Sequence, residues 1–184
     1  MPGNERTLLT QAQMAAGVQA LAQSILTANP GAESIALVGV FTRGVPLAKR
    51  IAAEIEKIGG VKVFLGTIDI TQYRDDLQTM AVLPKLEGSE IAFDLDDAVV
   101  ILCDEVMYTA RTSRAALDEL LDFGRPRCVQ IAALVDRVGR ELPLTAEYAG
   151  IRIDLPSNER VSVRFVDGDG YDEVFVKAWE RKTA

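Results

Sequence analysis

The residues best suited to chemistry lie in a short stretch between an apolar run and a helical pattern. The apolar run covers 98–103 and ends in two adjacent carboxylates, Asp104 and Glu105. A small, hydroxyl-rich turn follows, made of Tyr108, Thr109, Ala110, Arg111, Thr112 and Ser113. Carboxylates can hold sugar hydroxyls or a metal, and a turn that opens a helix can hold a phosphate through backbone N–H groups. The spacing alone is equally compatible with a ligand site and with an ordinary buried strand followed by a capped helix.

The elements around this stretch indicate a parallel α/β sheet. Further buried strands are predicted from the apolar runs at 35–41, 61–70 and 128–135. Helices are predicted over 10–28, with Thr10 as the N-cap, and over about 46–58. In such sheets the ligand binds beyond the carboxyl ends of the strands. The acid pair is predicted to lie at this edge.

Two other strand ends carry charged residues and are predicted to face the same ligand. Thr42, Arg43 and Gly44 follow the strand at 35–41, where a guanidinium beside exposed N–H groups suits a pyrophosphate. A third charged loop, 136–140, follows the strand at 128–135. The residues at its start are Val135, Asp136, Arg137 and Val138.

Composition limits the class of protein. The chain has 184 residues, 48% of them hydrophobic, which predicts one compact domain over 1–184. A formal net charge of −7 argues against general affinity for nucleic acid or anionic membranes. The sequence shows no signal pattern and no run long enough to span a membrane. Cys103 and Cys128 are predicted to be buried thiols, and we expect a cytoplasmic protein.

The chain contains no histidine, which restricts its chemistry. A Ser-His-Asp triad, a Cys-His pair and a zinc site with histidine ligands are all excluded. The available groups are carboxylates, guanidinium groups, amines, hydroxyls and backbone dipoles. These groups favour a reaction driven by positioning and electrostatic stabilisation over one that needs an activated nucleophile.

Two segments differ from the strand and helix pattern. The stretch at about 71–97 shows no sustained period and is predicted to be a flap over a charged ligand. The residues at the root of this flap are Tyr73, Arg74, Asp75 and Asp76. Alternating apolar residues over about 151–179 predict a β-hairpin whose turn is 167–170. The aspartates of that turn lack the spacing of a calcium loop.

Several segments together resemble the PyrR family of bacterial pyr operon attenuators, which are also uracil phosphoribosyltransferases. The matching segments are LVGVFTRGVPLAKRIA, DITQYRDDL, VVILCDEVMYTARTSRAALDEL, LVDRVGRELPL and AEYAGIRI. The third segment also resembles the phosphoribosyl-pyrophosphate (PRPP) motif of the wider type I phosphoribosyltransferases. The resemblance covers the chain from about residue 10 to 177.

The resemblance implies a type I phosphoribosyltransferase fold, in which helices flank a parallel sheet beside a small β hood. It implies that uracil and PRPP give UMP and diphosphate, with Mg²⁺ bridging the PRPP oxygens. Asp104 and Glu105 would hold the ribose hydroxyls and reach the metal only through PRPP. The turn at 108–113 would hold the 5-phosphate, and Thr42, Arg43 and Gly44 the diphosphate. Val135 to Val138 would lie near the base, and Asp104, Glu105 and Arg43 would be catalytic.

The chain departs from the family at two positions of the PRPP site. The family has Asp-Asp where this chain has Asp104 and Glu105, and the longer carboxylate would change the grip on the ribose. The family has Gly where this chain has Ala110. The added Cβ is expected either to crowd the phosphate or to demand an unfavourable backbone angle.

Binding of pyr messenger RNA is expected to be weakened. The family uses basic residues and histidine on the first helix and a Gly-His pair in the third loop. Here the helix at 10–28 has no basic residue, and Val138 and Gly139 replace the Gly-His pair. The cations left for a small basic face are Arg137, Arg140, Arg152 and Arg160. Because phosphate contacts dominate RNA affinity, the loss of several cations weakens binding steeply.

Two alternatives stay open at this point. One is a regulator that binds nucleotides and RNA without catalysis, which Glu105 and Ala110 favour and the acidic composition disfavours. The other is a phosphoribosyltransferase for another base, because backbone groups and loop shape often recognise the base. The resemblance, and no pattern in the residues, implies a homodimer or homotetramer.

Overall fold

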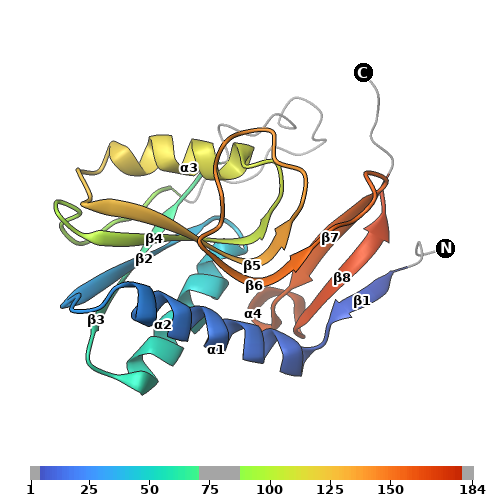
Figure 1. Cartoon of the computed structure of the whole chain (residues 1–184), viewed down its shortest axis with the longest axis horizontal. Helices are drawn as coiled ribbons and strands as arrows, with labels where there is room; N and C mark the ends of the chain where they lie inside the picture. The colour runs from blue at the N-terminus through green and yellow to red at the C-terminus, as the bar shows by residue number, and fades with distance from the viewer. Residues whose placement is uncertain (1–4, 71–87, 180–184) are drawn as a thin grey trace.

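The computed structural model describes residues 5–70 and 88–179, which form two sheets and the helices around them (Figure 1). The larger sheet is parallel, with strand order β3-β2-β4-β5-β6, and the smaller one is antiparallel, with order β1-β8-β7. Along the chain the elements are β1 (Arg6–Leu9), α1 (Gln11–Ala28), β2 (Ser34–Val40), α2 (Gly44–Ile58), β3 (Lys62–Ile68), β4 (Val99–Met107), α3 (Arg111–Leu121), β5 (Cys128–Arg137), β6 (Tyr148–Ile153), β7 (Glu159–Arg164), α4 (Val166–Asp169) and β8 (Glu173–Ala178). The predicted α/β class is confirmed.

Both faces of the parallel sheet are buried, which explains its continuous apolar runs. Side chains alternate along each strand, so Val99 and Ile101 of β4 pack with α1 and α2, while Val100 and Leu102 pack with α3. Figure 1 shows α1 and α2 on one face of the sheet and α3 on the other. The small sheet packs on the α1 and α2 side through apolar residues of β7 and β8.

The predicted start of the first helix is confirmed by its capping contacts. Thr10 has an extended backbone, and its hydroxyl accepts a hydrogen bond from the N–H group of Gln13. The side chain of Gln13 in turn accepts one from the N–H group of Thr10 at 2.9 Å. This reciprocal pair satisfies two N–H groups that have no partner inside the helix.

Several boundaries differ from the sequence prediction. β4 continues to Met107, past the acid pair, because its ladder with β5 pairs Asp104 with Ala133 and Met107 with Asp136. The apolar run ends at the first charged residue. The strand continues beyond it, because backbone hydrogen bonds between strands form with charged side chains as well. The prediction that the strand ends before the carboxylates was wrong.

The expected hairpin at about 151–179 is also corrected. Residues 148–153 form β6, a parallel edge strand of the large sheet, and the antiparallel pair begins at Glu159. The link between β7 and β8 is the single-turn helix α4 and not a simple turn. Cys103 is buried as expected, but Cys128 is only half-buried, at the start of β5.

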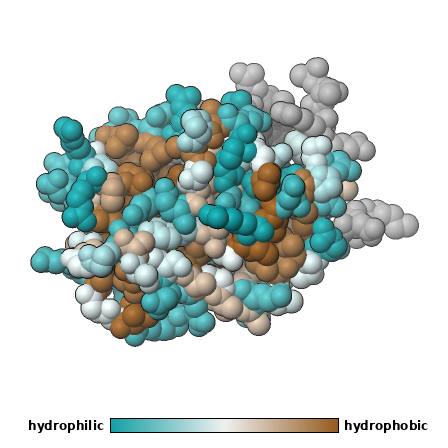
Figure 2. Space-filling model, viewed as in Figure 1, coloured by the Kyte–Doolittle hydropathy of each residue, from teal (hydrophilic) through white to brown (hydrophobic). Residues whose placement is uncertain are grey.

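The surface is mixed. Hydrophilic and hydrophobic residues are interspersed on the face shown in Figure 2. The large exposed apolar side chains include Ile58 at the end of α2, and Leu121 and Phe123 at and after the end of α3. No helix in the described part of the chain is both long and apolar enough to cross a membrane.

Candidate active site

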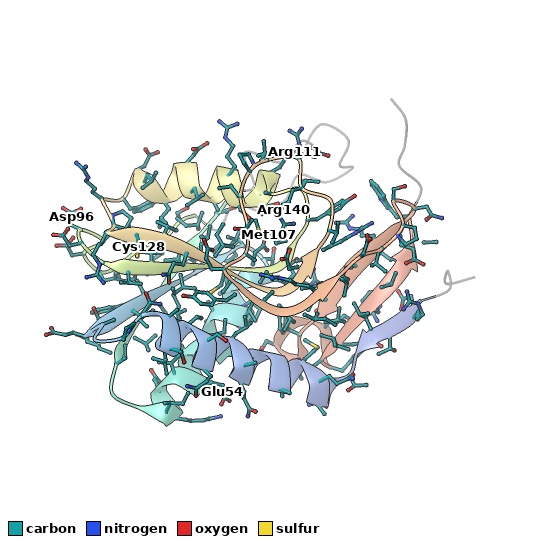
Figure 3. The ribbon with its side chains drawn as sticks, in the orientation of Figure 1. Glu54, Asp96, Met107, Arg111, Cys128 and Arg140 are labelled. Atoms are coloured by element: carbon teal, nitrogen blue, oxygen red, sulfur yellow. The ribbon has the colours of Figure 1, made fainter. Side chains whose placement is uncertain are left out.

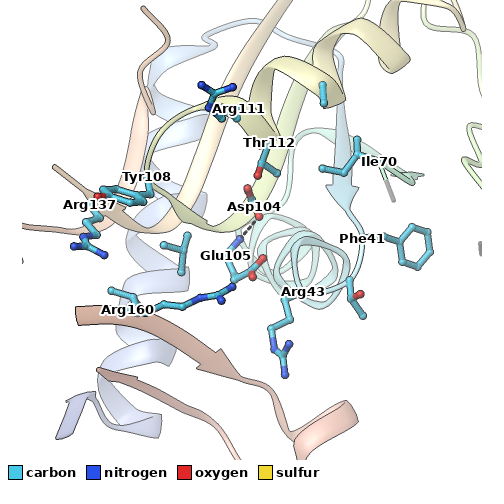
Figure 4. A pocket seen from close by; sticks show the side chains of 14 residues that line it. Phe41, Arg43, Ile70, Asp104, Glu105, Tyr108, Arg111, Thr112, Arg137 and Arg160 are labelled. Carbon is cyan, nitrogen blue, oxygen red and sulfur yellow. Dashed lines mark hydrogen bonds between the residues drawn. The ribbon is translucent and has the colours of Figure 1, made fainter. Parts of the chain in front are cut away.

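A cavity of about 470 Å³ lies at the carboxyl ends of β2 and β4, as the topology predicts (Figure 4). Its lining comes from the β2–α2 turn, from the end of β4 and the start of α3, and from β5 and β7. The lining residues are Phe41, Thr42, Arg43, Ile70, Asp104, Glu105, Val106, Tyr108, Arg111, Thr112, Ala115, Arg137, Arg160 and Val161. Three loops far apart in the sequence therefore meet at one hollow.

The arginines near the cavity lie at one end of the sheet. Figure 3 places Arg111 and Arg140 there, while Asp96 and Cys128 lie at the opposite end. The four arginines that line the cavity are Arg43, Arg111, Arg137 and Arg160. Positive charge around a concave site raises the local concentration of anions. The cavity thus combines a cationic rim with the carboxylates of β4.

Asp104 and Glu105 lie side by side on the cavity wall. Asp104 is 6% exposed, and Glu105 is partly exposed. The N–H group of Glu105 donates a hydrogen bond of 2.9 Å to Oδ1 of Asp104, drawn as the dashed line in Figure 4. Burial raises the pKa of the Asp104 carboxyl well above its ordinary value, and the neighbouring Glu105 raises it further. Ligand hydroxyls that donate to this carboxylate would stabilise its charged form.

The turn between β4 and α3 presents the start of a helix to the cavity. α3 begins at Arg111, and its N-cap residue Ala110 has no side-chain group to cap the first N–H groups. The N–H group of Arg111 donates a long hydrogen bond, 3.4 Å, to the hydroxyl of Thr109. The first N–H groups of a helix and the helix dipole favour a bound anion. Of the six predicted phosphate-binding residues, Tyr108, Arg111 and Thr112 line the cavity, and Thr109, Ala110 and Ser113 are not among the lining side chains.

Ala110 has a left-handed backbone, with φ of 72°. The expectation that this position demands an unfavourable backbone angle is confirmed. The methyl group is 3% exposed and packs with Met107, Ile131 and Ala133. Its burial offsets part of the backbone cost, which for an L-residue is roughly 1–2 kcal/mol.

The turn between β2 and α2 is built on a different constraint. Thr42 and Arg43 line the cavity, and the peptide bond between Phe41 and Thr42 is cis. Gly44 is buried, and a Cβ built there would overlap the carbonyl oxygen of Cys103 in β4. Gly44 therefore lets α2 pack closely on β4 and does not itself line the hollow.

The third loop is only partly as predicted. Arg137 lines the cavity, but its guanidinium donates to the carbonyl oxygens of Leu155, Pro156 and Glu159 and lies 4.2 Å over the ring of Tyr108. The other three base-proximal residues do not line the cavity. Val135 is in the core, Asp136 pairs with Arg140 and Arg152, and Val138 is 60% exposed.

Some lining residues were not predicted for the ligand site. Arg160 and Val161 come from β7, and Phe41 and Ile70 follow the ends of β2 and β3. The sequence places Arg160 only among the surface cations of a basic face. No local pattern identifies it as a ligand residue, because β7 reaches the cavity through tertiary contacts with β4, which lies far away in the sequence. The predicted flap residues Tyr73, Arg74, Asp75 and Asp76 lie outside the described residues.

The donor set fits a magnesium ion that is held together with a substrate. Within 5–70 and 88–179, no group of three or more metal-binding side chains lies together. The pair on β4 offers two carboxylates, and Mg²⁺ is usually bound by one or two carboxylates plus phosphate oxygens of the substrate. Asp104 and Glu105 are therefore suited to bind a phosphate-bearing ligand that itself carries the ion.

Comparisons with known proteins agree with this geometry. The model of the phosphoribosyl transferase domain family matches residues 5–165. A bifunctional protein PyrR from Clostridioides difficile is 44% identical over 170 residues, which cover 92% of this chain and 96% of that protein. A bifunctional protein PyrR from Deinococcus deserti is 45% identical, covering 95% of both. A solved hypoxanthine phosphoribosyltransferase of Trypanosoma cruzi has the same fold, with a TM-score of 0.70 at 17% identity, covering 95% of this chain and 97% of that one.

Proposed function

Because the chain belongs to the PyrR family of phosphoribosyltransferases, we propose that it transfers the phosphoribosyl group of PRPP to uracil. The bond between ribose C1 and the diphosphate oxygen breaks, the bond between C1 and uracil N1 forms, and the N1 proton is released. The observation that carries the proposal is the buried Asp104 beside Glu105, next to the start of helix α3. One wall of the cavity thus offers carboxylate acceptors for hydroxyl groups and a helix start for a phosphate.

In this proposal the acid pair orients the ribose. Asp104 and Glu105 accept hydrogen bonds from its hydroxyls and lie close to the positive charge that develops on the sugar. That reaction needs stabilisation of a leaving group and exclusion of water, not a nucleophile, which agrees with a chain that has no histidine. Water exclusion is assigned to the predicted flap, whose root is Tyr73 to Asp76. The prediction was wrong for residues 88–97, which pack on the sheet beside β3: Thr67 and Glu90 exchange backbone hydrogen bonds, and Leu95 is 1% exposed.

The β4–α3 turn and the β2–α2 turn are proposed to bind different phosphate groups of PRPP. The turn at 108–113 is proposed to hold the 5-phosphate with N–H groups, hydroxyls and Arg111. Thr42, Arg43 and Gly44 are proposed to hold the diphosphate, where the guanidinium stabilises the charge of the leaving group. Bound Mg²⁺ would supply further charge neutralisation on the diphosphate oxygens.

The base is proposed to bind between the third loop and the hood. Val135, Asp136, Arg137 and Val138 are predicted to lie near it, and Arg137 supports this placement because it lines the cavity. Its guanidinium binds the backbone at 155–159, which leads into β7. Arg137 is therefore proposed to position the small sheet β1-β8-β7, the predicted hood, beside the base.

Pyrophosphate release is the experiment that tests this function. PRPP and Mg²⁺ are incubated with the protein, and uracil is compared with hypoxanthine, guanine and orotate. Release with uracil alone is the expected result. Release with another base would reassign the substrate. Binding of PRPP or UMP without release would favour a non-catalytic nucleotide sensor, for which the strained backbone of Ala110 is the supporting observation.

We also propose that binding of pyr messenger RNA is weak in this chain. Three of the four candidate cations are engaged by groups of the protein itself, and one of them, Arg152, pairs with Asp136 and donates to the carbonyl oxygen of Ala146. Arg137 is 4% exposed, and Arg140 donates to the carbonyl oxygens of Tyr108 and Leu144 and pairs with Asp136. Tight, salt-resistant retardation of the organism's own pyr leader in a gel-shift series would contradict this.

The expected assembly follows from the family resemblance, and the expected location from the cysteine content and the lack of a signal pattern. We expect a homodimer or homotetramer in the cytoplasm. Sedimentation velocity at several protein concentrations distinguishes these states, and a monomer throughout would contradict the expectation.

A further inference from the structure

Two arginines of the α2 segment are held by aspartates around α4, and the two contacts are built differently. Arg50 donates through both terminal nitrogens to Asp172, each at 2.8 Å, and its Nη2 also contacts Asp167 at 3.3 Å. Its guanidinium lies 4.8 Å over the ring of Phe165. A bidentate pair with stacking is a strong, geometrically specific contact. It attaches α4 firmly to α2.

Arg43 is held much more loosely. Only its Nη2 contacts Asp169, at 3.0 Å to Oδ1 and 3.3 Å to Oδ2. The Arg43 side chain is 42% exposed, against 25% for Arg50. Its Nε is buried and has no hydrogen-bond partner among the described residues. This guanidinium therefore leaves hydrogen-bonding capacity unused, whereas both terminal nitrogens of Arg50 are engaged.

The Arg43 side chain points toward Asp169 and not toward the acid pair. In Figure 4 its guanidinium points away from Asp104 and Glu105, although the residue lines the cavity. A group proposed to bind diphosphate is thus turned toward a carboxylate outside the acid pair. The same Nη2 cannot serve Asp169 and a diphosphate equally well.

We propose that Asp169 is a positioning residue that holds Arg43 away from the diphosphate position in the ligand-free protein and releases it when diphosphate binds. The inference rests on the proposed function, because it needs diphosphate at the β2–α2 turn. Diphosphate carries more charge than a single carboxylate and offers several acceptors, so it competes for the guanidinium. α4 stays in place during the exchange because Arg50 keeps its contacts with Asp167 and Asp172.

This exchange makes Asp169 a competitor of the ligand. Its negative charge weakens the binding of both ligands that place a diphosphate group beside Arg43, namely PRPP and the diphosphate product. Removal of the charge is expected to lower the KM for PRPP and to slow diphosphate release. A residue with a purely structural role would lower stability without tightening anion binding.

The test compares Asp169→Asn with Asp167→Asn. The side-chain carbonyl of the introduced asparagine can still accept the hydrogen bond that the N–H group of Phe165 donates to Asp169 at 2.9 Å. Diphosphate with Mg²⁺ is titrated calorimetrically into each protein at low and high salt. Asp169→Asn is expected to bind about threefold to tenfold more tightly at low salt, and the gain should shrink at high salt. Asp167→Asn, in the same helix α4 but bound to Arg50, should stay within about twofold of wild type.

A double variant locates the effect. In an Arg43→Ala background, Asp169→Asn should give no further gain, because the competing pair no longer exists. Asp169→Ser, which keeps a short acceptor for the Phe165 N–H group, should repeat the gain of Asp169→Asn. Unchanged or weaker diphosphate binding in both Asp169 variants would overturn the inference. If wild type neither binds diphosphate nor releases it from PRPP, the proposed function fails instead.

Discussion

The two turns that meet at the cavity have opposite requirements at their central small residue. At the β2–α2 turn, Gly44 has no room for a Cβ because the carbonyl oxygen of Cys103 lies against it. At the β4–α3 turn, Ala110 has room for its methyl group but adopts a left-handed backbone. One position needs glycine for space, and the other would accept glycine for its backbone angle.

The difference shows why one glycine is kept while the other can be replaced. Overlap with a backbone carbonyl cannot be relieved by a rotamer change, since helix α2 or strand β4 would have to move. A left-handed angle costs a bounded amount that nearby packing offsets. The same substitution, glycine to alanine, is therefore expected to have very different consequences in the two turns.

The largest effect is expected for Gly44→Ala. The added Cβ overlaps β4 and forces α2 outward, so the free energy of unfolding should fall by about 3 kcal/mol and activity should be lost. Urea denaturation measures the stability. Gly168→Ala is the matched control, because nothing lies within 4 Å of a Cβ at that position. Equal stability of the two variants would contradict the spatial account of Gly44.

Asp104→Asn is expected to separate stability from activity. The neutral amide removes a buried charge but keeps an acceptor for the N–H group of Glu105. Loss of the charged ribose grip should lower kcat/KM by roughly 100-fold, while the melting temperature at pH 7 should rise.

The pH dependence of that gain follows from the raised pKa of Asp104. Below the unfolded value of about 4, the carboxyl is neutral in both states and costs nothing. As pH rises from there through the folded pKa, only the unfolded state loses the proton, so wild-type stability falls. The advantage of Asp104→Asn should therefore grow from about pH 4 to pH 7. An advantage that is largest at low pH would contradict it.

A smaller effect is expected at the third loop, for Arg137→Lys. The lysine ammonium cannot span the carbonyl oxygens of Leu155, Pro156 and Glu159 as the planar guanidinium does. Stability should fall by about 1–3 kcal/mol, and the KM for the base should rise more than that for PRPP. Arg114→Lys, with a side chain 67% exposed, is the control and should be nearly neutral.

The smallest effect is expected for Ala110→Gly. Relief of the left-handed backbone gains roughly 1–2 kcal/mol. Loss of a buried methyl group and greater freedom of the unfolded chain cost a similar amount. The free energy of unfolding should change by less than about 1 kcal/mol, as measured by urea denaturation. Ala110→Val, β-branched at a positive φ, should be strongly destabilising. A neutral Ala110→Val would contradict the backbone account.

Much of the site could be predicted from the sequence because its parts are local. The acid pair lies near the end of a recognisable buried strand, the hydroxyl turn and the Arg-Gly turn each follow one, and parallel topology brings such strand ends to one edge. The N-cap at Thr10 was likewise predicted from its neighbours in the chain, whereas its reciprocal contact with Gln13 was found only in the structure. Helix starts and apolar periods depend on neighbours in the chain, so the chain itself determined them.

Other features needed the tertiary structure. β1 and β8 pair although they lie near opposite ends of the chain, and β7 brings Arg160 into the cavity. The Arg43–Asp169 pair joins residues 126 positions apart. The sequence determined which residues are proposed to bind phosphate, ribose and diphosphate, since that proposal depends on side-chain type and local turns. The tertiary structure alone decided which of their charges are already paired and how deeply they are buried, because pairing and burial depend on contacts between distant segments.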